Sequence, residues 1–195
     1  MRISRAADYR SMPWKNGAGT TTVIAVFPEG ATLDDFDWRI SRAKVAAPGA
    51  FSAFPSVNRT LCLLSGEGVM LKVSGQGRRK LDVASPPFTF SGDTPVDAEP
   101  IGGAVEDLNV MTRRGRVSHR VEKIGVRSTV LLRRNGEDVL ILHACGAPLR
   151  VRSDDGTADL RPNDTVLLDS RSPSAIEVSS AESAEFFRID LQYIR

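Results

Sequence analysis

The sequence predicts an all-β protein of many short antiparallel strands, arranged as a sandwich or a barrel. Hydrophobic and polar residues alternate along most of its apolar stretches, as half-buried strands require, whereas helical periodicity is scarce. Turn-forming residues separate these stretches at short intervals, at Ser65-Gly66, Gly75-Gln76-Gly77, Asn135-Gly136, Asp155-Gly156 and Pro162-Asn163-Asp164.

The strands are assigned in chain order from this alternation. The last one is the clearest, because Phe187, Ile189 and Leu191 fall on one face and the polar residues between them fall on the other. The remaining strands are expected at residues 20–27, 38–44, 59–64, 69–73, 105–111, 128–133, 138–144, 149–152, 165–169 and 175–179. Asn135-Gly136 separates two apolar strands, which predicts a β-hairpin there.

The two halves of the chain resemble each other weakly. LCLLSGEGVMLKV, a glycine-rich turn and Leu81 in the first half match LILHACGAPLRV, an Asp-Gly turn and Leu160 in the second. Such a repeat predicts two β-barrel halves packed as one compact unit, at residues 1–114 and 128–195. Residues 115–127 are polar and poorly periodic, and they are expected to connect the halves.

Length and composition are those of a soluble globular protein. A chain of 195 residues can bury roughly 70% of its unfolded surface without disulfides or a structural metal. Its formal charge of +2 gives no strong field for nucleic acid or an anionic membrane, and no apolar run approaches the roughly 18–20 residues that span a bilayer. We expect a cytoplasmic protein in which Cys62 and Cys145 are buried, reduced thiols.

The sequence has few of the residue patterns that bind metals or perform nucleophilic catalysis. Its two histidines, His119 and His143, stand far apart, with no cysteine or carboxylate cluster at ligand spacing. His143 is expected to be a hydrogen-bonded core imidazole, and His119 to be solvated in the connector. No hydroxyl or thiol stands in a recognisable nucleophilic arrangement. We therefore predict no metal, no cofactor and no catalytic residue of these kinds.

Binding is better supported, because several polar segments can meet at one pocket. PWKNGAGTTT at residues 13–22 carries a flexible glycine turn, and the DWRIS and EDLNVMTRR strands each present a row of polar side chains on one face. Each row alone also fits the solvent face of a sandwich. Taken together, they predict a ligand site formed by Trp14, Asn16, Thr20, Arg39, Ser41, Phe51, Arg59, Asn109, Met111 and Arg113.

With GAFSAFPSVNR at residues 49–59 and PFTFSGD at residues 87–93, these segments resemble the HutD/Ves family in order and spacing. The resemblance implies a cupin-like bicupin of two jelly-roll halves and, for many members, an association with histidine utilisation. The sequence departs from the family pattern at Ala18, Val23, Ser56 and Asn58, where Gly, Glu, Gly and Asp are usual. The charges lost at Val23 and Asn58 would alter ligand preference if either residue lined the pocket.

The functional hypothesis is non-catalytic binding of a small metabolite that carries a carboxylate, because Arg39 and Arg59 each offer a planar two-point donor fork. By the resemblance, the role is regulatory or accessory in histidine catabolism, and the ligand is an intermediate such as urocanate or a formylated glutamate. Two other classes stay open: a metal-independent isomerase or lyase with Asp93 or Asp107 as base, and a stress-related protein without a dedicated ligand. No nucleic-acid or membrane partner is expected, and whether the chain forms a homodimer is left open.

Overall fold

The computed structural model describes residues 1–14, 19–169 and 175–195, and it confirms the all-β prediction. The first strands are β1 (Arg2–Ser4), β2 (Arg10–Pro13), β3 (Gly19–Phe27), β4 (Trp38–Val45), β5 (Gly49–Ala50), β6 (Val57–Ser65), β7 (Gly68–Val73), β8 (Gly77–Leu81), β9 (Phe88–Ser91), β10 (Val96–Ile101) and β11 (Val105–Arg113). They are followed by β12 (Val117–Val126), β13 (Thr129–Arg133), β14 (Val139–Cys145), β15 (Leu149–Ser153), β16 (Gly156–Leu160), β17 (Thr165–Asp169), β18 (Ala175–Ser179) and β19 (Ala184–Tyr193). A short 3-10 helix, η1, spans Ala6–Asp8.

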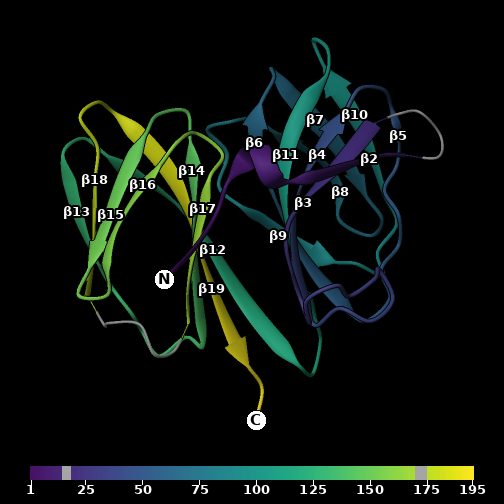
Figure 1. Ribbon diagram of the computed structural model, residues 1–195. Coiled ribbons are helices and arrows are strands. Elements are labelled where there is room, and N and C mark those ends of the chain that lie inside the picture. The colour runs from purple at the N-terminus through teal and green to yellow at the C-terminus, as the bar shows by residue number, and fades with distance from the viewer. Residues whose placement is uncertain (15–18, 170–174) are drawn as a thin grey trace. The chain divides into compact units, whose positions relative to one another are not determined.

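The chain divides into two units, each built from two sheets (Figure 1). The N-terminal unit is Arg10–Ser118, and the C-terminal unit joins Met1–Tyr9 to His119–Arg195. The N-terminal unit contains the sheets β2-β3-β4-β11-β6-β9 and β5-β10-β7-β8. The C-terminal unit contains the sheets β1-β17-β14-β19-β12 and β13-β18-β15-β16.

The two units repeat one strand order, as the internal sequence repeat suggested. Strands β4 to β11 correspond one by one to β12 to β19, each to the strand eight places later in the chain. The order β4-β11-β6-β9 in the N-terminal unit corresponds to the order β12-β19-β14-β17 in the C-terminal unit. In the same way, the order β5-β10-β7-β8 corresponds to the order β13-β18-β15-β16. Each strand of the N-terminal unit from β4 onward therefore has a counterpart in the C-terminal unit.

The unit boundaries differ from the expected halves at two places. Residues 115–127, expected as a connector, contain β12, which lies at the edge of the five-stranded sheet. An edge strand is exposed along much of its length, and this explains its weak periodicity. Residues 1–9 lie in the C-terminal unit, because Ile3 of β1 pairs with Val166 of β17 and Asp164 accepts a hydrogen bond from Arg5.

The predicted hairpin at Asn135-Gly136 is wrong. β13 pairs with β18, whereas β14 pairs with β17 and β19, so this turn carries the chain from one sheet of the C-terminal unit to the other. Gly136 does have the positive φ, +89°, that a turn glycine provides. The Glu137 carboxylate accepts a hydrogen bond from the Asn135 backbone N–H at 2.7 Å, so a side chain stabilises the turn without cross-strand pairing.

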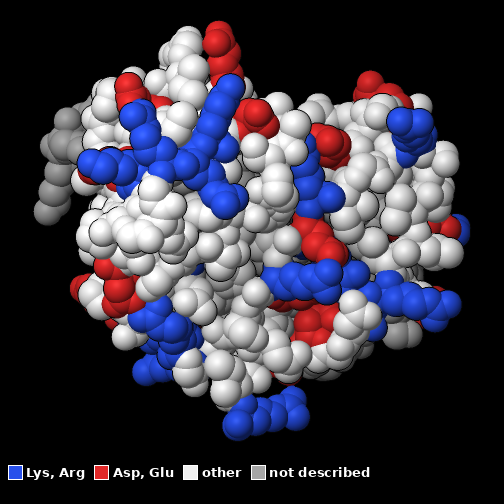
Figure 2. All heavy atoms as spheres, turned by 180° about the vertical axis from the view of Figure 1, so that it is seen from behind, with Lys and Arg blue, Asp and Glu red and all other residues white. Residues whose placement is uncertain are grey.

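Each unit buries an apolar core between its two sheets. Leu61, Leu71 and Phe90 belong to the core of the N-terminal unit, and Leu140 and Phe186 belong to that of the C-terminal unit. On the face drawn in Figure 2, Lys and Arg side chains lie among Asp and Glu side chains, in keeping with the small formal charge. Within the described residues, no helix has the length and apolar character needed to cross a membrane.

The structure also places the histidines and cysteines. His143 is fully buried and its Nδ1 lies 2.9 Å from Thr165 Oγ1, which confirms a hydrogen-bonded core imidazole. The expectation for His119 is wrong: it lies half-buried in β12, and burial lowers the pKa of His119 to about 4. Cys62 and Cys145 are both free thiols, but only Cys62 is fully buried, since Cys145 lies at the end of β14.

Candidate functional site

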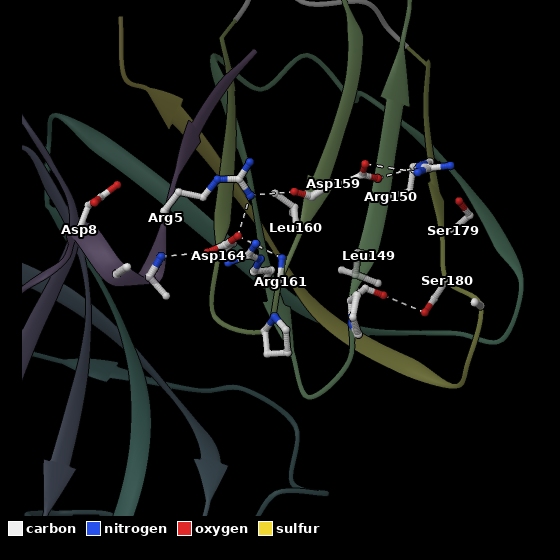
Figure 3. A pocket seen from close by; sticks show the side chains of 15 residues that line it. Arg5, Asp8, Leu149, Arg150, Asp159, Leu160, Arg161, Asp164, Ser179 and Ser180 are labelled. Carbon is white, nitrogen blue, oxygen red and sulfur yellow. Dashed lines mark hydrogen bonds and ion pairs between the residues drawn. The ribbon is translucent and has the colours of Figure 1, made fainter.

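Each unit contains a cavity lined by charged side chains. The cavity in the C-terminal unit is the larger of the two. It has a volume of about 910 Å³, and two of its three arginines, Arg5 and Arg150, face acidic partners (Figure 3). Arg5 Nη1 donates to Asp164 Oδ2 at 2.7 Å, and Arg150 Nε donates to Asp159 Oδ1 at 2.7 Å. Because these charges already neutralise each other, Arg5 and Arg150 gain little by binding an external anion.

The second cavity lies in the N-terminal unit and has a volume of about 570 Å³. We call it the Arg39 cavity. Its polar floor comes from β4, β6 and β11, and its walls come from the segments before β3 and β6. Seven residues of the predicted ligand site line it: Trp14, Arg39, Ser41, Phe51, Arg59, Asn109 and Met111.

The strand register explains why these residues meet. Arg39 of β4 pairs with Met111 of β11, and Met111 pairs with Arg59 of β6, so the two arginines flank Met111 in one row across three strands. Ser41 and Asn109 form the next row along β4 and β11. Neighbouring strands are about 4.8 Å apart, so the backbones of Arg39 and Arg59 lie about 10 Å apart and their long side chains reach over the same floor.

Arg59 is held by neighbours within the cavity. Its Nη2 donates to Asn109 Oδ1 at 2.8 Å, and its Nη1 donates to the Ser52 carbonyl at 3.3 Å. The guanidinium carbon also lies 5.1 Å from the ring centre of Phe51 and 5.5 Å from that of Phe54, within cation–π range. Burial lowers the pKa of Arg59 to about 10, with the nearby Asp107 charge opposing the shift. Arg59 is therefore charged and fixed in place.

Arg39 differs from Arg59 because it lacks such partners. It is 5% exposed, and burial lowers the pKa of its guanidinium. Among the residues that the structure describes, its Nε has no hydrogen-bond partner and no carboxylate forms an ion pair with it. A buried cation without a counter-ion costs free energy, which a bound anion would offset.

Asp107 gives the cavity a proton-binding group. Asn109 bridges it to Arg59, because Asn109 Nδ2 donates to Asp107 Oδ1 while Asn109 Oδ1 accepts from Arg59. Asp107 is 2% exposed, and burial raises the pKa of Asp107 to about 7 despite the opposing Arg59 charge. The carboxyl therefore changes its charge near neutral pH.

Aromatic side chains form the walls. Trp14 Nε1 donates to Thr21 Oγ1 at 2.7 Å, which fixes the indole over the cavity. Gly19 lets the indole lie close to the strand, because a Cβ there would clash with the Lys44 carbonyl and lie 3.1 Å from the Trp14 ring. Met12 and Leu33, which also line the cavity, are about half exposed and mark its opening to solvent.

Three residues of the predicted site do not line the cavity. Asn16 lies outside the described residues. Thr20 is exposed and its neighbour Thr21 lines the cavity instead, because Thr21 pairs with Ala43 on the inward face. Arg113 donates to the carbonyls of Asp34 and Phe36, at 2.8 and 3.0 Å, and so fastens the loop that carries Leu33.

The residues missed from the predicted site follow from alternation and loop packing. Asp107 shares the inward face with Asn109 and Met111, and this alternation would have included it in the site. Met12 and Leu33 come from segments that pack against the strands, and no local sequence pattern predicts this packing. Asp93, the other candidate base, lies outside the cavity and is bound by Arg114 and Ser91, which hold the pKa of Asp93 down at about 2.

The cavity does not fit a divalent cation. Its ionisable lining consists of Arg39, Arg59 and Asp107, so positive charge exceeds negative charge. Across the described parts of the chain, no three His, Cys, Asp or Glu side chains lie together as a metal site. The donor set suits an anion instead.

The fold is cupin-like, and the Arg39 cavity is its candidate binding site. Solved structures share the fold: an Escherichia coli protein, YhhW, aligns over 100% of this chain and 98% of its own with a TM-score of 0.71 at 9% identity. A cupin 2 conserved barrel domain protein from Leptotrichia buccalis aligns over 93% and 92%, with a TM-score of 0.59 at 9% identity. The HutD family model matches residues 6–186, and the chain belongs to the HutD family.

Similar proteins of known sequence or structure agree with this membership. HutD from Pseudomonas fluorescens SBW25 aligns over 100% of this chain and 99% of its own, with a TM-score of 0.86 and 27% identity. An uncharacterised 21.2 kDa protein from the hutC 3′ region of Pseudomonas putida is 38% identical over 63% of each chain. Protein Ves of Citrobacter koseri is 44% identical over 58% of this chain, and the aligned part spans 60% of that relative.

Of the four departures from the family pattern, the three that the structure describes lie outside the lining of the Arg39 cavity. Val23 and Asn58 do not line the Arg39 cavity, so the condition for altered ligand preference is not met. Ala18 lies outside the described residues. Ser56 has a φ of +60°, in the left-handed region that favours the usual glycine.

We expect Ser56→Gly to stabilise the protein by about 0.5–1 kcal/mol, because glycine adopts this backbone conformation without a Cβ clash. The hydrogen bonds at Ser56 are made by its backbone N–H and carbonyl, to Asp93 Oδ1 and from Arg114 N, so the variant keeps them. Urea denaturation measures the change. Asn163→Gly is the control, since Asn163 also has a positive φ, +70°, but asparagine tolerates it and the gain should be smaller. An unchanged or lower stability of Ser56→Gly would contradict the assignment of strain.

Proposed function

We propose that this protein binds a small metabolite carrying a carboxylate in the Arg39 cavity, and that it serves histidine catabolism as an accessory protein without catalysing a step. The observation that carries the proposal is the buried Arg39 guanidinium, which has no counter-ion among the described residues. A guanidinium binds a carboxylate through two parallel hydrogen bonds, and the low dielectric constant around a buried group strengthens them.

The remaining lining supports a small organic ligand rather than an inorganic anion alone. Trp14, Phe51 and Phe54 supply apolar walls, while Ser41 and Asn109 supply polar groups on the floor. A volume of about 570 Å³ is within the range of small-molecule sites. The histidine-utilisation role rests on family membership and on the names of HutD and the hutC-region relative. Urocanate and a formylated glutamate are the first ligands to test.

A thermal-shift screen followed by calorimetry tests the proposal. The screen uses histidine-pathway intermediates and other small mono- and dicarboxylates, each paired with its methyl ester or amide. A ligand that binds the native state raises the melting temperature by mass action, and the neutral analogue should not. If no carboxylate raises the melting temperature more than its neutral analogue does, the proposal is wrong.

One observation favours a second function. Asp107 lines the cavity with its pKa raised by burial to about 7, and a carboxylate titrating near the working pH suits general-base catalysis. A metal-independent isomerase or lyase is therefore the alternative, with Asp107 as base and Arg39 holding the substrate. Incubating the stabilising ligand with the protein and following its NMR spectrum separates the two. New resonances that depend on Asp107 identify an enzyme.

A further inference from the structure

We propose that the C-terminal unit contains a second carboxylate-binding centre, built around Arg188, which the chain fills with its own Glu137. This inference rests on the C-terminal unit alone and does not require a ligand in the Arg39 cavity. Its first support is the strand-by-strand repeat, in which β14 and β19 correspond to β6 and β11.

The pairing register places Arg188 on the strand and face that correspond to those of the cavity residue Asn109. Asn109 of β11 pairs with Leu61 of β6, and Arg188 of β19 pairs with Leu142 of β14. Leu61 and Leu142 both face the core between the two sheets of their unit. Arg188 therefore points into the interior of the C-terminal unit, as Asn109 of the corresponding strand points into that of the N-terminal unit.

The centre around Arg188 is already occupied by carboxylates of the chain. Arg188 Nε donates to both oxygens of Asp190, at 2.8 and 3.1 Å, and its Nη2 lies 3.5 Å from Glu137 Oε1. Arg134 Nε approaches the same Glu137 oxygen at 3.3 Å. The side chains of Arg134, Glu137 and Arg188 are 7%, 4% and 7% exposed, so Glu137 is a buried carboxylate held by two guanidiniums.

The position of Glu137 in the chain explains how it reaches this centre. It lies in the turn just before β14, and the counterpart segment before β6 carries Phe51, Ser52 and Phe54, which line the Arg39 cavity. The same structural position therefore supplies a wall in one unit and a carboxylate in the other. Two positive and two negative side chains balance in the filled centre, so removing Glu137 leaves an excess positive charge there.

The ligand class follows from the atoms that Glu137 contributes. Replacing Glu137 by Ala removes one methylene group and the carboxylate, which together have the size of acetate. We expect Glu137→Ala to melt about 10 °C below the parent, because a buried ion pair loses one partner. Sodium acetate should restore about half of that loss, whereas sodium chloride at equal ionic strength and neutral acetamide should not.

Three variants make the test specific. Glu182→Ala, which removes an exposed glutamate of the same unit, should melt like the parent and show no acetate effect. Glu137→Gln keeps the shape of the side chain and fills the space, so acetate should not rescue it. Glu137→Ala combined with Arg39→Met should keep its acetate response, because the rescue arises at Arg188 and not in the Arg39 cavity.

The outcomes separate this inference from the proposed function. An acetate response that disappears with Arg39→Met would mean that acetate acts through the Arg39 cavity, and the Arg188 centre would be refuted. Equal effects of acetate and chloride would also overturn it, as would a Glu137→Ala protein that stays unfolded in both salts. Failure of the carboxylate screen in the parent would refute the proposed function and leave the acetate rescue of Glu137→Ala unaffected.

Discussion

Replacing Arg39 by methionine is expected to weaken carboxylate binding by about 10- to 100-fold while leaving the free protein as stable as the parent or more stable. The loss corresponds to about 1.5–3 kcal/mol, the scale of hydrogen bonds to a charged group. The stability gain follows because Arg39 is a buried cation without a counter-ion among the described residues, and methionine retains the apolar contacts of its stem. Calorimetry measures affinity and urea denaturation measures stability.

Two further variants sharpen this result. Arg39→Lys should also bind poorly, because an ammonium keeps the charge but lacks the planar fork. Arg78→Ala removes an exposed arginine of β8 in the same unit and should change neither property. Arg59 is a less specific test, because Arg59→Ala would also remove contacts to Asn109, the Ser52 carbonyl and three phenylalanine rings. If Arg39→Met binds as tightly as the parent, the cavity is not the carboxylate site.

The second large effect concerns the pH dependence that Asp107 confers. The ordinary pKa of its carboxyl is 3.8, and burial raises it to about 7 in the folded protein. At pH values between 3.8 and about 7, the Asp107 carboxyl has lost its proton in the unfolded chain but still holds it in the folded protein. The contribution of Asp107 to the free energy of unfolding therefore falls as pH rises from about 4 to 7, and it stays low above 7.

Asp107→Asn should remove this penalty, because asparagine carries no charge and its Oδ1 can still accept the hydrogen bond from Asn109. We expect the stability of the variant relative to the parent to rise between pH 4 and pH 8 by on the order of 3 kcal/mol. Urea denaturation at both pH values measures it, with Asp97→Asn, an exposed aspartate of β10, as the matched control. A difference that does not change with pH would show that Asp107 is ionised throughout.

The same titration should affect ligand binding. Above pH 7 the ionised Asp107 adds a negative charge beside Arg59, so the parent should bind a carboxylate more weakly at pH 8 than at pH 6. Asp107→Asn should bind with an affinity that changes little over this interval. Calorimetry at the two pH values provides the comparison, and an identical pH profile for parent and variant would exclude Asp107 as the group responsible.

The sequence alone determined the fold class and most of the strands. Alternation is a local property, and the segments 165–169 and 175–179 coincide with β17 and β18. Strands with a charged or weakly alternating sequence were missed. In β8 (Gly77–Leu81), at a sheet edge, three charged residues follow the glycine, and β12 alternates only weakly. The positive φ angles at Gly66, Gly136 and Asn163 likewise agree with the turn signals.

Only the tertiary structure decided which residues share a cavity and which charges are paired. On strand Trp38–Val45, the face that carries Arg39 and Ser41 is buried along its whole length, so this polar row is an interior lining rather than a solvent face. Alternation alone leaves that choice open. The register across β4, β11 and β6 brings Arg39 and Arg59 together and leaves Arg113 to fasten a loop. Arg39 and Arg188 look alike in sequence, yet one has no counter-ion among the described residues and the other is neutralised by Asp190 and Glu137. Such pairing depends on contacts between distant strands and turns, which no local pattern encodes.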